Sequence, residues 1–194
     1  METAQLTIIL GGVRSGKSRL AEEKAVAEAK KRGGGLHYIA CGKVTDGEMA
    51  ERVRLHQQQR QQSTVTWTTW EQPTQLEQLA NQFTKQDVIL LDCLTTLVTN
   101  EWFLASEDES EWKQPLFHAE IKQRVITEVN RLRQAAAAVI IVSNELAFEP
   151  LSSPLVFYYA KTLGELHQYF VSEADEAVLV EHGLPLIQKG GEAR

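Results

Sequence analysis

Short apolar runs alternate with longer amphipathic segments along most of the chain. Four short runs are largely apolar and rich in β-branched residues, which is typical of strands buried on both faces of a sheet. They cover residues 6–10, 36–41, 87–92 and 138–143. Helical periodicity marks the segments between and after them, at residues 18–30, 46–62, 115–136 and 155–171. This alternation predicts a mostly parallel sheet with helices on both faces.

Three further segments have weaker patterns. Residues 65–70 alternate like a strand, and Pro73 predicts the start of a helix that runs through Phe83. Residues 100–114 mix acidic residues with aromatic ones, which predicts an irregular exposed segment or a helix end.

The end of the chain has the pattern of a β-hairpin. Residues 176–181 and 184–187 are apolar runs, and His182 and Gly183 between them suit a tight turn. No repeat, low-complexity tract or linker divides the chain, and 43% of its 194 residues are hydrophobic. We therefore expect a single domain over residues 1–194, with enough apolar surface for a substantial core.

The first apolar run leads directly into a phosphate-binding motif. Residues 11–18 fit the pattern G-x-x-x-x-G-K-[ST] without a mismatch. Glycines let the backbone wrap so that several N–H groups converge on phosphate oxygens, and the following helix directs its positive end at the same anion. The alternative is a glycine-rich turn before an ordinary helix, but strand, loop and helix occur in the order that phosphate binding requires.

The motif predicts a nucleoside triphosphate site with a role for each residue type. Lys17 would reach the β- and γ-phosphates, and Ser18 would bind a magnesium ion that arrives with the nucleotide. The predicted nucleotide-binding residues of the loop are Gly11, Gly12, Val13, Arg14, Ser15, Gly16, Lys17 and Ser18.

Asp92 is the second candidate for nucleotide chemistry. It ends the apolar run of residues 87–92, where a carboxylate can hold magnesium beside a phosphate loop. Buried strands also end in Asp because this residue starts turns, so the position alone leaves both interpretations open. The presence of the phosphate loop favours nucleotide and metal binding.

Composition excludes several classes of partner. The net charge is −6 and no long block of Lys or Arg occurs, so we expect no nucleic-acid partner. No apolar run approaches the length of a membrane span, and the first residues lack a signal-peptide pattern, so we expect a cytoplasmic location. Cys41 and Cys93 are too few for a disulfide framework or a zinc site, which favours reduced, partly buried thiols.

His56 is a further candidate, four residues after Arg52 on one face of a predicted helix. Imidazole can act as a covalent nucleophile or carry a proton near neutral pH. Spacing alone favours the simpler interpretation, a solvated histidine on an exposed helix. The other histidines lack the spacing of metal ligands.

The order of these motifs resembles a known enzyme family. The matching stretches are residues 11–19, 38–40, 48–52 with His56, 67–69 with Glu71, 91–100 and 142–145. Together they resemble the bifunctional adenosylcobinamide kinase/adenosylcobinamide-phosphate guanylyltransferases of cobalamin synthesis. The resemblance implies a three-layer α/β P-loop NTPase domain of RecA-like architecture, with a mostly parallel sheet and a C-terminal hairpin.

The resemblance also implies an activity. Members of this family phosphorylate the aminopropanol hydroxyl of adenosylcobinamide and then transfer GMP from GTP to that phosphate through a guanylylated histidine. It implies that His56 is this nucleophile, that Lys17 is catalytic and that Glu71 and Asp92 contribute to nucleotide binding. Ser18 and Asp92 would be the Mg²⁺ ligands, GTP or ATP and adenosylcobinamide the substrates, and a homo-oligomer the assembly.

The resemblance weakens after Glu145. A glycine-rich stretch of the family is replaced by residues 146–151, and an Arg-Asp pair and an Asn are replaced by Ala160, Lys161 and His167. Two alternatives follow. The chain could retain one of the two steps or act on another substrate, or it could be a non-catalytic nucleotide-binding regulator.

The aromatic residues of the 100–114 segment also allow two interpretations. Trp102, Phe103 and Trp112 could form part of an oligomer interface, or they could pack beneath a loop.

Overall fold

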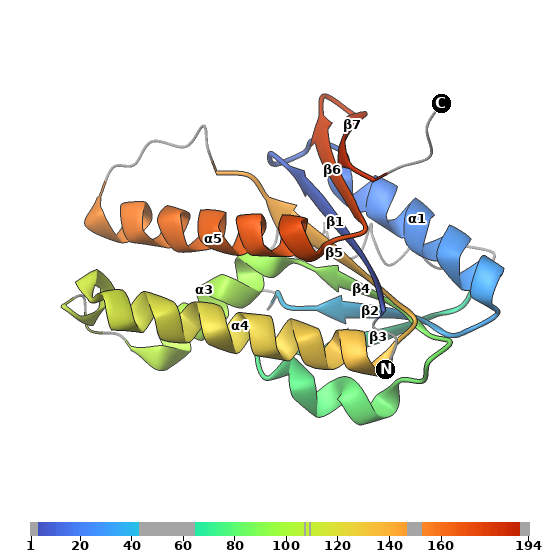
Figure 1. Ribbon diagram of the computed structural model, residues 1–194, viewed down its shortest axis with the longest axis horizontal. Helices are drawn as coiled ribbons and strands as arrows, with labels where there is room; N and C mark the ends of the chain where they lie inside the picture. The colour runs from blue at the N-terminus through green and yellow to red at the C-terminus, as the bar shows by residue number, and fades with distance from the viewer. Residues whose placement is uncertain (1–3, 43–64, 107, 109, 147–152, 191–194) are drawn as a thin grey trace, which may run out of the picture.

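The computed structural model describes residues 4–42, 65–106, 108, 110–146 and 153–190 (Figure 1). Its strands are β1 (Gln5–Gly11), β2 (Leu36–Ala40), β3 (Trp67–Glu71), β4 (Val88–Asp92), β5 (Ala138–Asn144), β6 (Glu176–Glu181) and β7 (Leu184–Lys189). Its helices are α1 (Lys17–Arg32), α3 (Leu94–Ala105), α4 (Pro115–Ala135) and α5 (Pro154–Glu173), with short 3₁₀ helices η1 (Leu76–Gln82) and η2 (Glu111–Lys113).

One sheet contains all seven strands, in the order β3-β2-β4-β5-β1-β6-β7. Every neighbouring pair is parallel except β6 and β7, which form the antiparallel terminal hairpin. The mostly parallel sheet and the hairpin are therefore confirmed. Strand β5 lies between β1, which enters the phosphate loop, and β4, which ends at Asp92.

Helices cover both faces of the sheet, which confirms the three-layer α/β architecture (Figure 1). On one face, the buried Ala21, Ala25 and Ala29 of α1 pack in a cluster with Ile9 and other strand residues. Small side chains at these positions let the helix lie close to the strands. The larger cluster on the other face joins the strands to α3, α4 and α5.

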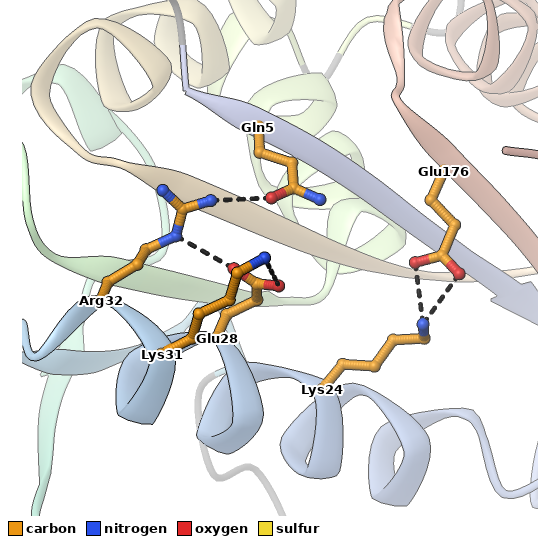
Figure 2. A network of polar contacts seen from close by, with 6 residues as sticks. All are labelled: Gln5, Lys24, Glu28, Lys31, Arg32 and Glu176. Carbon is orange, nitrogen blue, oxygen red and sulfur yellow. Dashed lines mark hydrogen bonds and ion pairs between the residues drawn. The ribbon is translucent and has the colours of Figure 1, made fainter. Parts of the chain in front are cut away.

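Polar contacts fix α1 against the sheet, away from the phosphate loop (Figure 2). Lys24 contacts both carboxylate oxygens of Glu176 at 2.8 Å, which ties α1 to β6. Arg32 donates to Glu28 on its own helix at 3.0 Å and to the Gln5 side chain on β1 at 2.8 Å. The helix that follows the loop is thus held at its middle and at its end.

The prediction for residues 100–114 was correct for a helix end, which residues 100–105 form, and wrong in the exposure of two tryptophans. Residues 94–105 form the continuous helix α3, and Trp102 is fully buried while Trp112 is only 7% exposed. Trp102 packs against the rings of Phe117 and His118 from α4. These two tryptophans therefore belong to the core, and Phe103 alone of the three aromatics is exposed, at 47%.

The predicted helix over residues 73–83 was wrong in type and start. The structure has a 3₁₀ helix that begins at Leu76, after Gln75 in the left-handed region with φ 57°. Two contacts from distant residues fix this start. The Leu76 amide donates to Glu128 Oε2 at 3.0 Å, and the Asn100 side chain donates to the Pro73 carbonyl at 2.9 Å.

The other predicted helices and strands are confirmed to within two residues at their ends, except the helix over residues 46–62, which lies outside the described residues. No helix in the described part of the chain is long and apolar enough to cross a membrane.

Candidate active site

The phosphate loop connects β1 to α1 through a backbone that L-residues rarely adopt. Arg14 and Gly16 lie in the left-handed region, with φ 60° and φ 94°. Within the loop the Ser15 amide donates to the Gly12 carbonyl at 3.2 Å, and α1 begins as the Leu20 amide donates to the Gly16 carbonyl at 3.2 Å. The loop therefore turns sharply and presents the amino-terminal end of α1 at the carboxyl end of the sheet.

A side chain at position 11 has no room in this structure, so Gly11 is required. A Cβ at this position would lie 2.6 Å from Ser15 Oγ and 2.6 Å from the Val180 carbonyl oxygen, which is backbone of β6. Both distances are far shorter than van der Waals contact. The first glycine of the motif thus allows the loop to pack closely against a neighbouring strand.

Lys17 is only 8% exposed, which is unusual for lysine. Its ammonium donates to the Gly12 carbonyl at 3.0 Å, so the charge lies over the loop. Burial raises the pKa of the Cys93 thiol and the Asp92 charge adds to this rise, while hydrogen bonding from Thr96 and the Lys17 ammonium oppose it. The loop cation is therefore close enough to influence the end of β4.

Two other strand ends support the loop. The Gly183 amide, in the turn between β6 and β7, donates to the Ser15 carbonyl at 2.9 Å, and the Glu145 amide donates to the Gly11 carbonyl at 3.0 Å. His182 and Gly183 form this turn with φ 51° and 82°. The terminal hairpin is thus part of the site, a role that its sequence pattern did not indicate.

Asp92 lies at the same edge of the sheet as the loop, at the end of β4. The Tyr38 hydroxyl donates to Asp92 Oδ2 at 2.9 Å, and the Cys41 amide donates to the Asp92 carbonyl at 3.1 Å. These bonds fix the position of the carboxylate beside β5. The phosphate loop and Asp92 therefore lie at the same edge of the sheet, on either side of the end of β5.

The donor set around the loop suits a magnesium ion that is held mainly by phosphate oxygens. Ser18 lies in the first turn of α1 and Asp92 supplies one carboxylate. Within the described ranges, no group of three or more His, Cys, Asp or Glu side chains could hold a metal ion. Magnesium beside nucleotides needs only one or two protein oxygens, because phosphates and water complete its shell.

One predicted site residue, Glu71, is not brought to the loop. Glu71 is exposed at the end of β3, the edge strand, and four strand spacings separate β3 from β1. At about 4.8 Å per spacing, this is roughly 19 Å. His56 lies outside the described residues, in the segment between β2 and β3.

A buried polar network beside the loop was not identified from the sequence. Ser143 Oγ, at the end of β5, lies 3.0 Å from Thr95 Oγ1 on α3 and 2.8 Å from His167 Nε2 on α5. Ser143 is fully buried and His167 is 7% exposed. Because the three residues are far apart in the chain, no local pattern could have indicated this contact.

Comparison with known proteins agrees with this geometry. A family model described as cobinamide kinase / cobinamide phosphate guanyltransferase matches residues 7–187. The chain belongs to this family. It is 30% identical over 183 residues to the bifunctional adenosylcobalamin biosynthesis protein CobU of Escherichia coli, covering 92% of this chain and 97% of that protein. It is 34% identical over 186 residues to CobP, of the same description, from Pseudomonas aeruginosa, covering 94% and 96%.

The flagellar accessory protein FlaH from Methanocaldococcus jannaschii is also similar in structure, over 98% of this chain and 80% of that one. The TM-score is 0.47 and the two chains are 16% identical.

The chain departs from the pattern expected of the family in the part that follows Glu145. Residues 147–152 lie outside the described residues. Ala160 and Lys161 lie on α5, where Lys161 is exposed and 4.0 Å from Glu165. His167 lies on the buried side of the same helix.

Cys41 and Cys93 are both free and buried, in agreement with the prediction of free thiols.

Proposed function

We propose that this chain phosphorylates the hydroxyl of adenosylcobinamide with a nucleoside triphosphate and then transfers GMP from GTP to the new phosphate. The observation that carries the proposal is the arrangement of Lys17, the phosphate loop and Asp92 at one sheet edge, in a member of the cobinamide kinase / cobinamide phosphate guanyltransferase family. Ligands of parallel α/β sheets bind at this edge.

In the first step, the loop amides and the Lys17 ammonium would hold the triphosphate and stabilise the charge that builds on the leaving group. The Ser18 hydroxyl and the Asp92 carboxylate would hold Mg²⁺, which neutralises phosphate charge. The buried position of Lys17 supports this role, because electrostatic interactions are stronger where water is excluded. The same loop serves GTP in the second step.

In the second step, His56 is proposed as the nucleophile. Its imidazole nitrogen would form a bond to the α-phosphorus of GTP while the bond to the bridging oxygen breaks, which releases pyrophosphate. The phosphate of the acceptor would then displace the histidine and take the GMP group. Dividing one displacement into two is the usual advantage of covalent catalysis.

The test uses GTP labelled at the α-phosphate, with Mg²⁺ and without the corrinoid. The label should become attached to the protein, and the bond should be labile to acid and stable to base, as a phosphoramidate is. The variant His56→Asn should form no labelled protein yet keep most of its kinase activity. Label that persists in this variant would exclude His56 as the nucleophile.

The remaining features are proposed on the same basis. Glu71, on the edge strand, would contact the base or ribose of the nucleotide, because it is too far from β1 to reach the loop phosphates.

We propose a single cytoplasmic domain that forms a homo-oligomer. The exposure of Leu184, Leu186 and Ile187 on edge strand β7, at 67%, 44% and 55%, supports an interface there. Light scattering of the purified protein tests the assembly.

A second candidate is an enzyme that performs only one of the two steps. It is favoured by the replacements at Ala160, Lys161 and His167 on α5. Separate assays of cobinamide phosphorylation and of GMP transfer distinguish the two candidates. If the protein turns over no substrate in either assay but binds GTP, the regulator alternative is supported instead.

A further inference from the structure

The sheet order defines which residues face the terminal phosphate of a nucleotide in the loop. Strands β4, β5 and β1 are neighbours and all parallel, so their carboxyl ends lie side by side. The loop begins at the end of β1 and Asp92 stands at the end of β4. A phosphate held between these two elements would lie over the end of β5, which Glu145 follows directly.

Glu145 is attached to the loop and its carboxylate is oriented. Its backbone amide donates to the Gly11 carbonyl at 3.0 Å. Its Oε1 accepts from the Leu146 amide at 2.9 Å, and its Oε2 lies 3.9 Å from His167 Nδ1. The side chain is 29% exposed. A carboxylate in this position is accessible to a substrate and is also held by the protein.

The buried network is compatible with a hydrogen on Nδ1 of His167. The Asn144 amide, which can only donate, contacts Thr95 Oγ1 at 2.8 Å. The Thr95 hydroxyl can therefore donate to Ser143 Oγ, and the Ser143 hydroxyl can donate to His167 Nε2. In this arrangement Nδ1 carries the hydrogen and directs it towards Glu145.

The charge state of His167 agrees with this arrangement. Burial lowers the pKa of His167, and the Glu145 charge opposes this shift without reversing it. The imidazole is then neutral at pH 7, as acceptance of a hydrogen bond at Nε2 requires. The gap of 3.9 Å between Nδ1 and Oε2 exceeds a hydrogen bond, but such contacts in active sites often tighten when substrate binds.

We infer that Glu145 is the general base of the kinase step and that His167 is the residue that positions it. This inference rests on the proposed function. The acceptor hydroxyl gives its proton to the Glu145 carboxylate as its oxygen forms a bond to the γ-phosphorus. The bond from that phosphorus to the bridging oxygen breaks, and its electron pair stays on the nucleoside diphosphate. The protonated Glu145 then releases its proton to water.

The second step has no such requirement, which makes the role of Glu145 testable. The acceptor of GMP is a phosphate monoester, which is already largely ionised at neutral pH, since its second pKa is about 6. No hydroxyl proton has to be removed. Loss of the base should therefore impair phosphorylation alone, whereas loss of His56 should impair GMP transfer alone.

The first variant is Glu145→Gln, which keeps size and hydrogen-bonding capacity but cannot accept the proton. The kinase kcat should fall by about a hundredfold or more, the scale of general base catalysis, with both KM values changed less than about threefold. Labelling of the protein by GTP should match the wild type. The control is Glu23→Gln, an exposed carboxylate on α1.

Two substitutions of His167 test the positioning role. Asn places its amide nitrogen near the position of imidazole Nδ1, and Gln reaches the position of Nε2. His167→Asn should therefore keep the kinase kcat within about fivefold, and His167→Gln should lose about tenfold or more at similar KM, because orientation of a catalytic group affects kcat. Thermal unfolding of both variants shows that each is folded.

The outcomes separate the two proposals. A wild type that forms no cobinamide phosphate contradicts the proposed function and, with it, this role. A wild type with full kinase activity and a Glu145→Gln variant within tenfold of it contradicts only the general base. If His167→Gln keeps activity and His167→Asn loses it, the contact with Ser143 is what matters, and the positioning of Glu145 by His167 is excluded.

Discussion

Replacing Glu128 by Gln should remove most of the pH dependence of stability between pH 6 and 8. Glu128 lies on α4 and is 2% exposed, beside the fully buried Glu101 of α3. Glu101 Oε2 contacts the Arg124 guanidinium at 3.0 Å, and Glu128 Oε2 accepts from the Leu76 amide at 3.0 Å. Neither Oε1 has a donor among the described residues, and one proton shared between the two carboxyl groups would satisfy both.

The magnitude follows from the pKa of Glu128. Burial raises this pKa from 4.5 to about 8; the Glu101 and Glu77 charges add to the rise and the Leu76 amide opposes it. Because the folded pKa is raised, the folded protein retains a proton that the unfolded chain releases. Its contribution is complete below the unfolded value of 4.5 and is lost as the pH rises through about 8. Each pH unit in this window changes the free energy of unfolding by up to ~1.4 kcal/mol, or about 2 kcal/mol from pH 6 to 8.

Urea unfolding at pH 6, 7 and 8 measures this difference. The wild type should lose about 2 kcal/mol more over the range than Glu128→Gln, whose side-chain carbonyl still accepts from Leu76. The control is Glu120→Gln, an exposed carboxylate on the same helix, which should follow the wild type. If the wild type and Glu128→Gln change in parallel with pH, the two carboxyl groups do not share a proton and the reasoning is wrong.

Three further predictions concern the loop and α5. Lys17→Ala should slow both phosphorylation and GMP transfer by about a hundredfold or more, while Lys30→Ala, an exposed lysine on α1, should not; assays of each step check this. In urea unfolding, Gly11→Ala should lower the free energy of unfolding by about 1–3 kcal/mol, because the new Cβ would clash with the Val180 carbonyl. The control is Gly12→Ala, which has open space around its Cβ and should change the free energy of unfolding by less than about 0.5 kcal/mol. Ala160→Arg combined with Lys161→Asp should change the affinity for the corrinoid more than that for GTP in binding titrations, and equal changes in both would contradict a role of α5 in substrate selection.

The fold could be predicted where local pattern decides the structure. The apolar strands β1, β2, β4 and β5 are buried almost throughout, so their β-branched runs need no information from elsewhere in the chain. The phosphate loop could be predicted for the same reason, because its glycines and its helix are contiguous. The strand–helix alternation then defines the class of sheet.

Helix α3 could not be predicted in this way, because its buried stripe contains a charged residue. Leu94, Leu97, Val98 and Trp102 follow helical spacing, but Glu101 interrupts the apolar pattern. The sequence pattern indicates an exposed carboxylate, whereas the structure buries it against Arg124 of α4. The start of η1 depends likewise on Glu128, 52 residues away. Both errors have the same cause, a buried carboxylate whose partners lie on other elements.

The phosphate loop could be predicted from the sequence, whereas the backbone contacts that fix the loop could not. The Ser15 carbonyl accepts from Gly183 and the Gly11 carbonyl accepts from Glu145, and each donor lies just after a strand adjacent to β1. Only the order of strands brings these donors to the loop. Since backbone bonds from the ends of both neighbouring strands fix the loop, it would need little reorganisation to bind a phosphate. A substitution in the terminal hairpin that removes the Gly183 contact should therefore act on nucleotide affinity, although no residue of the hairpin belongs to the motif.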